Sequence, residues 1–72
     1  MTRGKNYKIE MFGGDLNGAQ RYYSTLPIAT REAKRYIKRN LEKYYSNSCV
    51  YIYAVTGKFP LPLISILDEN DI

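Results

Sequence analysis

Only one stretch of the sequence repeats apolar side chains at helical spacing, and this limits what the chain can fold into. Within residues 31–45, apolar positions recur every three or four residues, at Ala33, Ile37, Leu41 and Tyr44. Thr30 is a suitable N-cap, and Glu32 would lie near the positive end of the helix dipole. The turn-forming residues 46–48 predict the end of the helix. We therefore expect a single amphipathic helix that packs against one surface.

The sequence on both sides of this helix has the character of strands. Alternating or β-branched and aromatic residues occupy four stretches, at residues 5–12, 19–25, 49–56 and 61–67. The glycine-rich segment 13–18 predicts a hairpin loop between the first two. Pro60 and Pro62 confine the start of the last strand to an edge or an irregular lead-in.

The order of these elements predicts an α+β fold, a two-layer ββαββ arrangement in which one helix packs on one face of a three- or four-stranded antiparallel sheet. With 72 residues, the chain is long enough for one small domain, residues 1–72. We expect residues 1–4 and 68–72 to fray. One helix covers one face only, so the other face of the sheet stays open. Its expected tyrosines come from the second and third strands: Tyr22 or Tyr23, Tyr51 and Tyr53.

The absence of histidine and the single cysteine, Cys49, exclude several classes of function. The chain has no internal disulfide framework and no ordinary zinc ligand set, and it lacks the usual general base near neutral pH. We therefore predict a protein that is not an enzyme, with no catalytic residue, no metal and no cofactor. The sequence also has no apolar run long enough to cross a bilayer and no signal-peptide pattern. We expect a reducing, cytoplasmic location.

The glycine-rich segment matches two ligand-binding motifs only in part. Its Gly13 and Gly18 have the spacing of a phosphate-binding loop, but the following Lys and Ser or Thr are missing. The stretch 15–18 resembles part of a calcium loop without the remaining ligands. A hairpin loop is the better interpretation.

The outer side of the predicted helix carries a set of six cations, Arg31, Lys34, Arg35, Lys38, Arg39 and Lys43. Such a basic face contacts phosphates or an acidic partner in many proteins. The alternative is a solvated face in which Glu32 and Glu42 form weak ion pairs at helical spacing. The pattern alone leaves both interpretations open.

Charge is unevenly distributed along the chain. Residues 1–58 hold 11 basic and 4 acidic side chains, a net charge of +7. Residues 59–72 hold no basic and three acidic side chains, a net charge of −3. The apolar residues 61–67 must be buried, either as a fourth strand of the same chain or against a second subunit. A homodimer is therefore one alternative.

Two functions fit these features. The first is a small module that binds and regulates, or inhibits, a partner protein through its tyrosine-bearing sheet face or its basic helix. A partner that handles nucleic acid would suit the positive charge of the chain. The second is direct nucleic-acid binding by the basic helix and the tyrosine face. In size and character the chain resembles the small accessory proteins of phages and mobile elements, many of which bind a host machine, although no motif carries this resemblance. We favour the first function.

Overall fold

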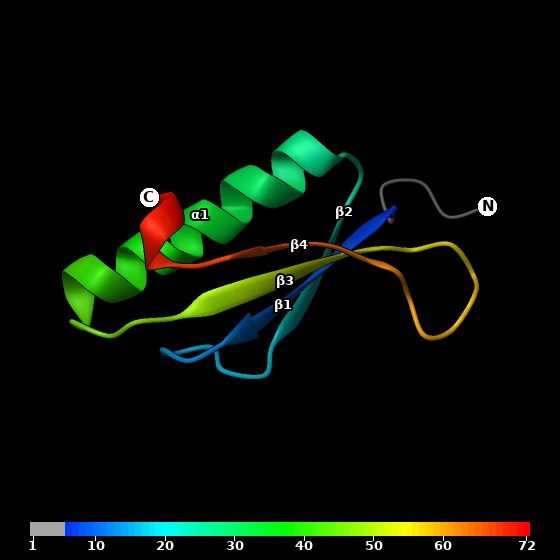
Figure 1. Cartoon of the computed structure of the whole chain (residues 1–72). Coiled ribbons are helices and arrows are strands. Elements are labelled where there is room, and N and C mark those ends of the chain that lie inside the picture. The colour runs from blue at the N-terminus through cyan, green and yellow to red at the C-terminus, as the bar shows by residue number, and fades with distance from the viewer. Residues whose placement is uncertain (1–5) are drawn as a thin grey trace.

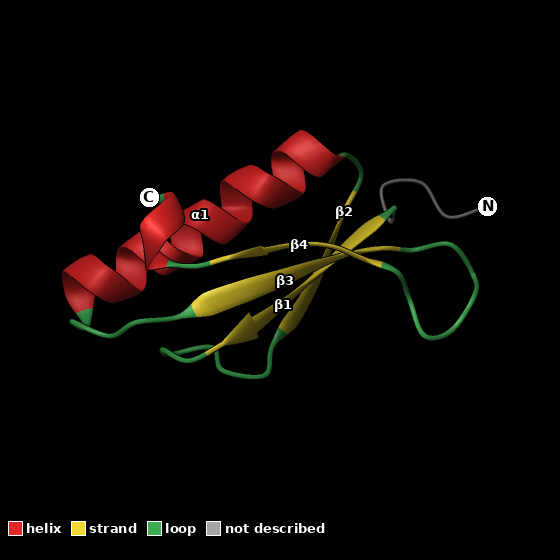
Figure 2. Ribbon diagram, viewed as in Figure 1, coloured by secondary structure: helices red, strands yellow, loops and turns green. Residues whose placement is uncertain are grey.

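The computed structural model describes residues 6–72 and shows one helix lying across one face of a four-stranded antiparallel sheet (Figure 1). The elements in chain order are β1 (Tyr7–Phe12), β2 (Gln20–Tyr23), α1 (Leu26–Lys43), β3 (Cys49–Ala54), β4 (Leu63–Leu67) and a short 3-10 turn, η1 (Glu69–Asp71). The strand order in the sheet is β2-β1-β3-β4. Figure 2 shows the helices on one side of the sheet only. The predicted α+β fold with ββαββ order is confirmed; residues 1–4, expected to fray, lie outside the described part.

The helix begins at Leu26, five residues earlier than predicted. Thr25 caps it instead of Thr30, and the Thr25 hydroxyl accepts a hydrogen bond from the Ile28 N–H at 3.3 Å. Pro27 falls in the first turn, where its missing N–H would have had no partner within the helix. The prediction was wrong at this boundary because a proline suits the first turn of a helix as well as the end of a strand.

The apolar residues near the C-terminus pair within the chain. β4 is hydrogen-bonded to β3, with Tyr51 opposite Ile66 and a register shift between Ile52 and Tyr53. After β4 the chain turns back toward α1 and ends in η1 (Figure 1). There the Asp68 carboxylate accepts a hydrogen bond from the Asn70 N–H at 2.9 Å. Residues 68–72, which the sequence predicts to fray, therefore form one capped turn.

The core lies between α1 and the sheet. Its buried apolar side chains are Ile9, Met11, Ala29, Ala33, Tyr36, Ile37, Val50 and Ile52. The helix presents a slightly different side to the sheet than its apolar repeat predicts. Tyr36 and Asn40 are buried, whereas Tyr44 is the C-cap residue and is 46% exposed. The buried side of α1 is therefore centred on the line through Ala29, Ala33 and Asn40.

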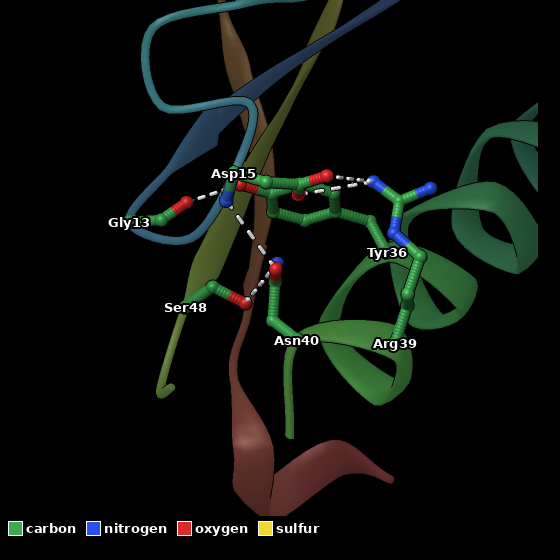
Figure 3. A network of polar contacts seen from close by, with 6 residues as sticks. All are labelled: Gly13, Asp15, Tyr36, Arg39, Asn40 and Ser48. Atoms are coloured by element: carbon green, nitrogen blue, oxygen red, sulfur yellow. Dashed lines mark hydrogen bonds and ion pairs between the residues drawn. The ribbon is translucent and has the colours of Figure 1, made fainter. Parts of the chain in front are cut away.

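Asn40 is a fully buried polar residue at the point where α1, β3 and the loop after β1 meet (Figure 3). Its side-chain amide donates a hydrogen bond to the Ser48 hydroxyl at 3.3 Å, and its carbonyl oxygen accepts one from the Asp15 N–H at 3.4 Å. Both ends of the amide are thus satisfied, which a buried polar group requires to avoid a large desolvation cost.

Two further contacts fasten the glycine-rich loop to α1 (Figure 3). The Tyr36 hydroxyl donates a hydrogen bond to the Gly13 carbonyl. One guanidinium nitrogen of Arg39 lies 3.1 Å from each carboxylate oxygen of Asp15. The loop connects two antiparallel strands, as predicted, and its polar groups bind the protein's own helix.

Gly14 lies tightly against the helix at Asn40. It adopts a φ of +74°, and a Cβ at this position would lie 2.4 Å from the Asn40 side-chain nitrogen. Gly18, in the same loop, has a similar φ of +86°, but a Cβ there would meet no atom within 4 Å. The two glycines therefore share the same backbone requirement and differ in steric surroundings.

This difference predicts unequal costs of substitution. We expect Gly14→Ala to lower the free energy of unfolding by about 1–3 kcal/mol more than Gly18→Ala, because only Gly14→Ala also overpacks the Asn40 site. Urea unfolding followed by circular dichroism measures both. In an Asn40→Ala background the difference should disappear. Equal losses for the two glycines in the unsubstituted background would contradict the close packing of the loop on α1.

Candidate functional site

The pairing of β1 with β2 decides which tyrosine of β2 belongs to the face opposite the helix. Tyr22 lies opposite Lys8, and Tyr23 lies opposite Tyr7. Because side chains alternate between the faces, and Ile9 is buried against the helix, Lys8 and Tyr22 share the uncovered face. Tyr23 lies on the helix side, where it packs against the core. The register therefore selects Tyr22, of the two alternatives, to lie with Tyr51 and Tyr53 on the uncovered face.

We define the open face as the side chains of the four strands that point away from α1. Cross-strand register and alternation assign to it Lys8, Glu10, Phe12, Gln20, Tyr22, Cys49, Tyr51, Tyr53, Leu63 and Ile66. The sequence prediction missed Phe12, Leu63 and Ile66. Alternation in residues 5–12 would have been sufficient to find Phe12, but the register of β4 was not available from the sequence.

Aromatic rings form a continuous strip along the middle of the open face. The Phe12 and Tyr51 ring centroids are 4.9 Å apart with an angle of 65° between the planes. Tyr51 and Tyr53 lie 6.4 Å apart and are nearly parallel, with an angle of 28°. The Lys8 ammonium group lies 4.9 Å from the centre of the Tyr53 ring. These neighbours restrict the rings, so little conformational entropy remains to be lost when a ligand binds.

The open face is close to electrically neutral. Lys8 and Glu10 are its only charged side chains, and their charges cancel. Burial, together with the nearby Glu10 carboxylate, raises the pKa of Tyr53, so its hydroxyl keeps its proton at alkaline pH values where an unperturbed tyrosine begins to ionise. Toward the β4 edge the face becomes aliphatic, and Leu63 and Ile66 remain 48% and 49% exposed.

The six cations of the helix are all exposed, and those at positions 35 and 39 border the β1–β2 side of the sheet. The set is Arg31, Lys34, Arg35, Lys38, Arg39 and Lys43. The three arginines have acidic neighbours. Arg31 and Arg35 lie 3.6 and 3.0 Å from Glu32, and Arg39 lies 3.1 Å from Asp15. The three lysines form no ion pair within residues 6–72. The structure does not bring the basic helix side and the open face together, since the sheet and the core separate them.

A cleft of about 330 Å³ lies between α1 and the β1–β2 side of the sheet. Tyr23 and Tyr36 contribute to its lining, and Arg21, Glu32 and Arg35 are among its charged residues. Burial raises the pKa of Tyr23, and the Glu32 carboxylate adds to this, whereas the two guanidinium groups oppose it. Sequence reasoning missed this cleft because it depends on how far α1 extends over the short strand β2.

The described residues do not assemble a recognisable catalytic or metal centre. Within residues 6–72, no group of three or more Cys, Asp or Glu side chains is placed to hold a metal ion. Burial and the nearby acidic residues 68 and 69 raise the pKa of the Cys49 thiol, which lowers its nucleophilicity at neutral pH. In the same part of the chain, α1 is not apolar enough to cross a membrane.

Comparison of the chain with protein-family models, with curated proteins and with solved structures gives no match. Function must therefore be inferred from the geometry of the chain itself.

The raised pKa of Tyr53 predicts how stability depends on pH. As pH rises above 10, the unfolded chain releases this proton before the folded chain does, so the free energy of unfolding decreases. We expect the decrease between about pH 8 and pH 11 to be smaller for Tyr53→Phe, which has no proton to lose there. Urea unfolding at the two pH values measures it. An equal decrease in both proteins would contradict the environment described for Tyr53.

Proposed function

We propose that this protein is a non-enzymatic module that binds a partner protein through the open face and regulates it. The observation that carries this proposal is a sheet face in which rigid aromatic rings and exposed aliphatic side chains adjoin and the net charge is zero. The centres of protein interfaces are enriched in tyrosine and depleted in charge. Tyrosines held in well-packed surroundings are also frequent hot spots of binding energy.

The charge distribution favours a protein partner over direct nucleic-acid binding. Proteins that stack single-stranded bases on aromatic side chains also place cations beside them, because the phosphate backbone supplies much of the affinity. Here Lys8 is the only cation of the open face, and Glu10 balances it. The larger cationic set lies on the opposite side of the molecule, and half of it has acidic neighbours.

Regulation by this module would come from covering a surface of the partner. A protein without catalytic groups changes the activity of its target by blocking a site or by favouring one conformation. When the open face is occupied, the three lysines of α1 still face the solvent. A partner that itself handles nucleic acid suits this arrangement, because the lysines add a favourable long-range field toward phosphates.

The open face is tested by comparing two pairs of tyrosines. After affinity capture and mass spectrometry identify the partner, we expect the double variant Tyr51→Ala, Tyr53→Ala to bind it at least about tenfold more weakly, the loss typical of hot-spot residues. The matched control replaces Tyr44 and Tyr45, which are exposed and lie at the end of α1, whereas Tyr51 and Tyr53 are half-buried. Titration calorimetry measures both. Full affinity in the first variant, with native circular dichroism, would refute the proposal.

Direct nucleic-acid binding makes a separate prediction. We expect no saturable change in fluorescence anisotropy with labelled single- or double-stranded DNA or RNA at about 150 mM salt, because the open face lacks the cations that such binding needs. Submicromolar binding would contradict the choice of a protein partner. If such binding weakened steeply with salt and disappeared in Lys34→Glu, Lys38→Glu, the basic helix side would be the nucleic-acid interface.

A further inference from the structure

β4 forms one edge of the sheet, and apart from the register shift beside Ile64 it has few of the features that usually protect an edge strand. The sheet order leaves its outer side without a neighbouring strand among residues 6–72. Residues 63–67 contain no charged residue and no proline, and Ile64 and Ile66 are 41% and 49% exposed. Edge strands of soluble proteins commonly carry charges or prolines, or are very short, because their free N–H and C=O groups pair readily with another strand. β2, at the other edge, has only four residues and includes a cation, Arg21.

The sequence of β4 is symmetric. Leu63–Leu67 reads Leu-Ile-Ser-Ile-Leu in both directions, with Ser65 at the centre. If two copies of β4 pair antiparallel about a two-fold axis at Ser65, each serine faces its own counterpart, and Ile64 of one copy faces Ile66 of the other. An interface with two-fold symmetry must be self-complementary in this way.

The backbone of β4 is oriented for such pairing. Ala54 in β3 donates its N–H to the Pro62 carbonyl at 3.0 Å, toward β4. Backbone groups alternate in direction along a strand, so Ile52, two residues earlier and opposite Ser65, also points toward β4. The polar groups of Ser65 therefore face β3 and those of Ile66 face outward, while Ile64 is the residue that the register shift leaves without a partner in β3. In the symmetric pairing, the two serines form a non-hydrogen-bonded pair.

The charges that flank β4 favour antiparallel over parallel pairing. Three acidic residues follow the strand, at positions 68, 69 and 71, and Lys58 precedes it. Antiparallel pairing brings the acidic end of one copy toward the end of the other copy that carries the lysine. Parallel pairing would place the two acidic ends together, where like charges repel.

We propose that two copies of this chain pair antiparallel through β4, with the two-fold axis at Ser65. The result is one continuous sheet that joins the two four-stranded sheets. Because the axis is perpendicular to the sheet, both α1 helices lie on one side, and both open faces lie side by side on the other. The pairing uses the strand edge and not the open face, so it is independent of the proposed function.

Disulfide trapping tests the position of the axis. In a Cys49→Ser background, which removes the native thiol, Ser65→Cys should form a disulfide-linked dimer under mild oxidation. Non-hydrogen-bonded pairs have Cα atoms about 4.5 Å apart, which suits a disulfide. The matched control is Ile64→Cys in the same background. In the symmetric pairing the two copies of residue 64 are diagonal neighbours, too far apart for a disulfide. We expect at least tenfold faster linkage for Ser65→Cys, and equal rates would overturn the proposal.

Solution mass provides the second test. Sedimentation equilibrium of the full chain at about 100 µM, a concentration sufficient for a micromolar dimer, should give twice the monomer mass of 8.4 kDa. Ile64→Lys should give the monomer mass with unchanged circular dichroism, because a charge at the edge opposes pairing. A monomeric wild-type chain would overturn the proposal. The Tyr51→Ala, Tyr53→Ala variant should remain dimeric, which separates failure of the dimer from failure of the proposed function.

Discussion

The structure depends on a single constraint, which is that one helix has to bury one face of a four-stranded sheet. α1 has 18 residues, and its apolar side meets the alternate residues of the two central strands, so that Ile9, Val50 and Ile52 are almost completely buried. Among residues 6–72 no second α-helix covers the other face, since η1 is one short turn that lies on the α1 side (Figure 1). The open face is thus a consequence of the fold.

The polar groups around the glycine-rich loop are used to hold that loop against the helix. Tyr36, Arg39 and Asn40 hold the loop after β1 to the helix, and Ser48 accepts a hydrogen bond from the Asn40 amide. The glycines of this loop, which resemble a phosphate-binding motif in spacing, allow the backbone to approach Asn40 closely. The polar network therefore stabilises the fold, and the open face, the β4 edge and the lysines of α1 lie outside it.

Much of the fold was predictable from local patterns. The hairpin, the helix and the strand at Cys49–Ala54 each have a strong periodicity, and their order fixes a two-layer architecture. The start of α1 was not predictable, because Leu26-Pro27 suits both a strand end and a helix start. The burial of Asn40 was also missed, since it depends on a loop distant in the sequence that approaches the helix.

The candidate site was predictable in kind but not in composition. Alternation in β3 placed Tyr51 and Tyr53 on the open face, and this was sufficient to expect an aromatic surface. The choice between Tyr22 and Tyr23 required the register of β2 against β1, which is set by the length and conformation of the intervening loop. The contribution of Ile66 required the register of β4, which contains a shift near Ile52 that no local pattern indicates.

The central claim is that the open face is exposed to solvent in the free protein. Nuclear magnetic resonance with a soluble paramagnetic probe measures this directly, because the probe broadens the signals of side chains that it can approach. We predict strong broadening of the Tyr51 and Tyr53 rings and of the Ile66 methyl groups, and little effect on the buried Ile37 and Ile52 methyl groups. Protection of the two tyrosine rings equal to that of the core isoleucines would contradict the claim, since it would mean that another surface covers the open face.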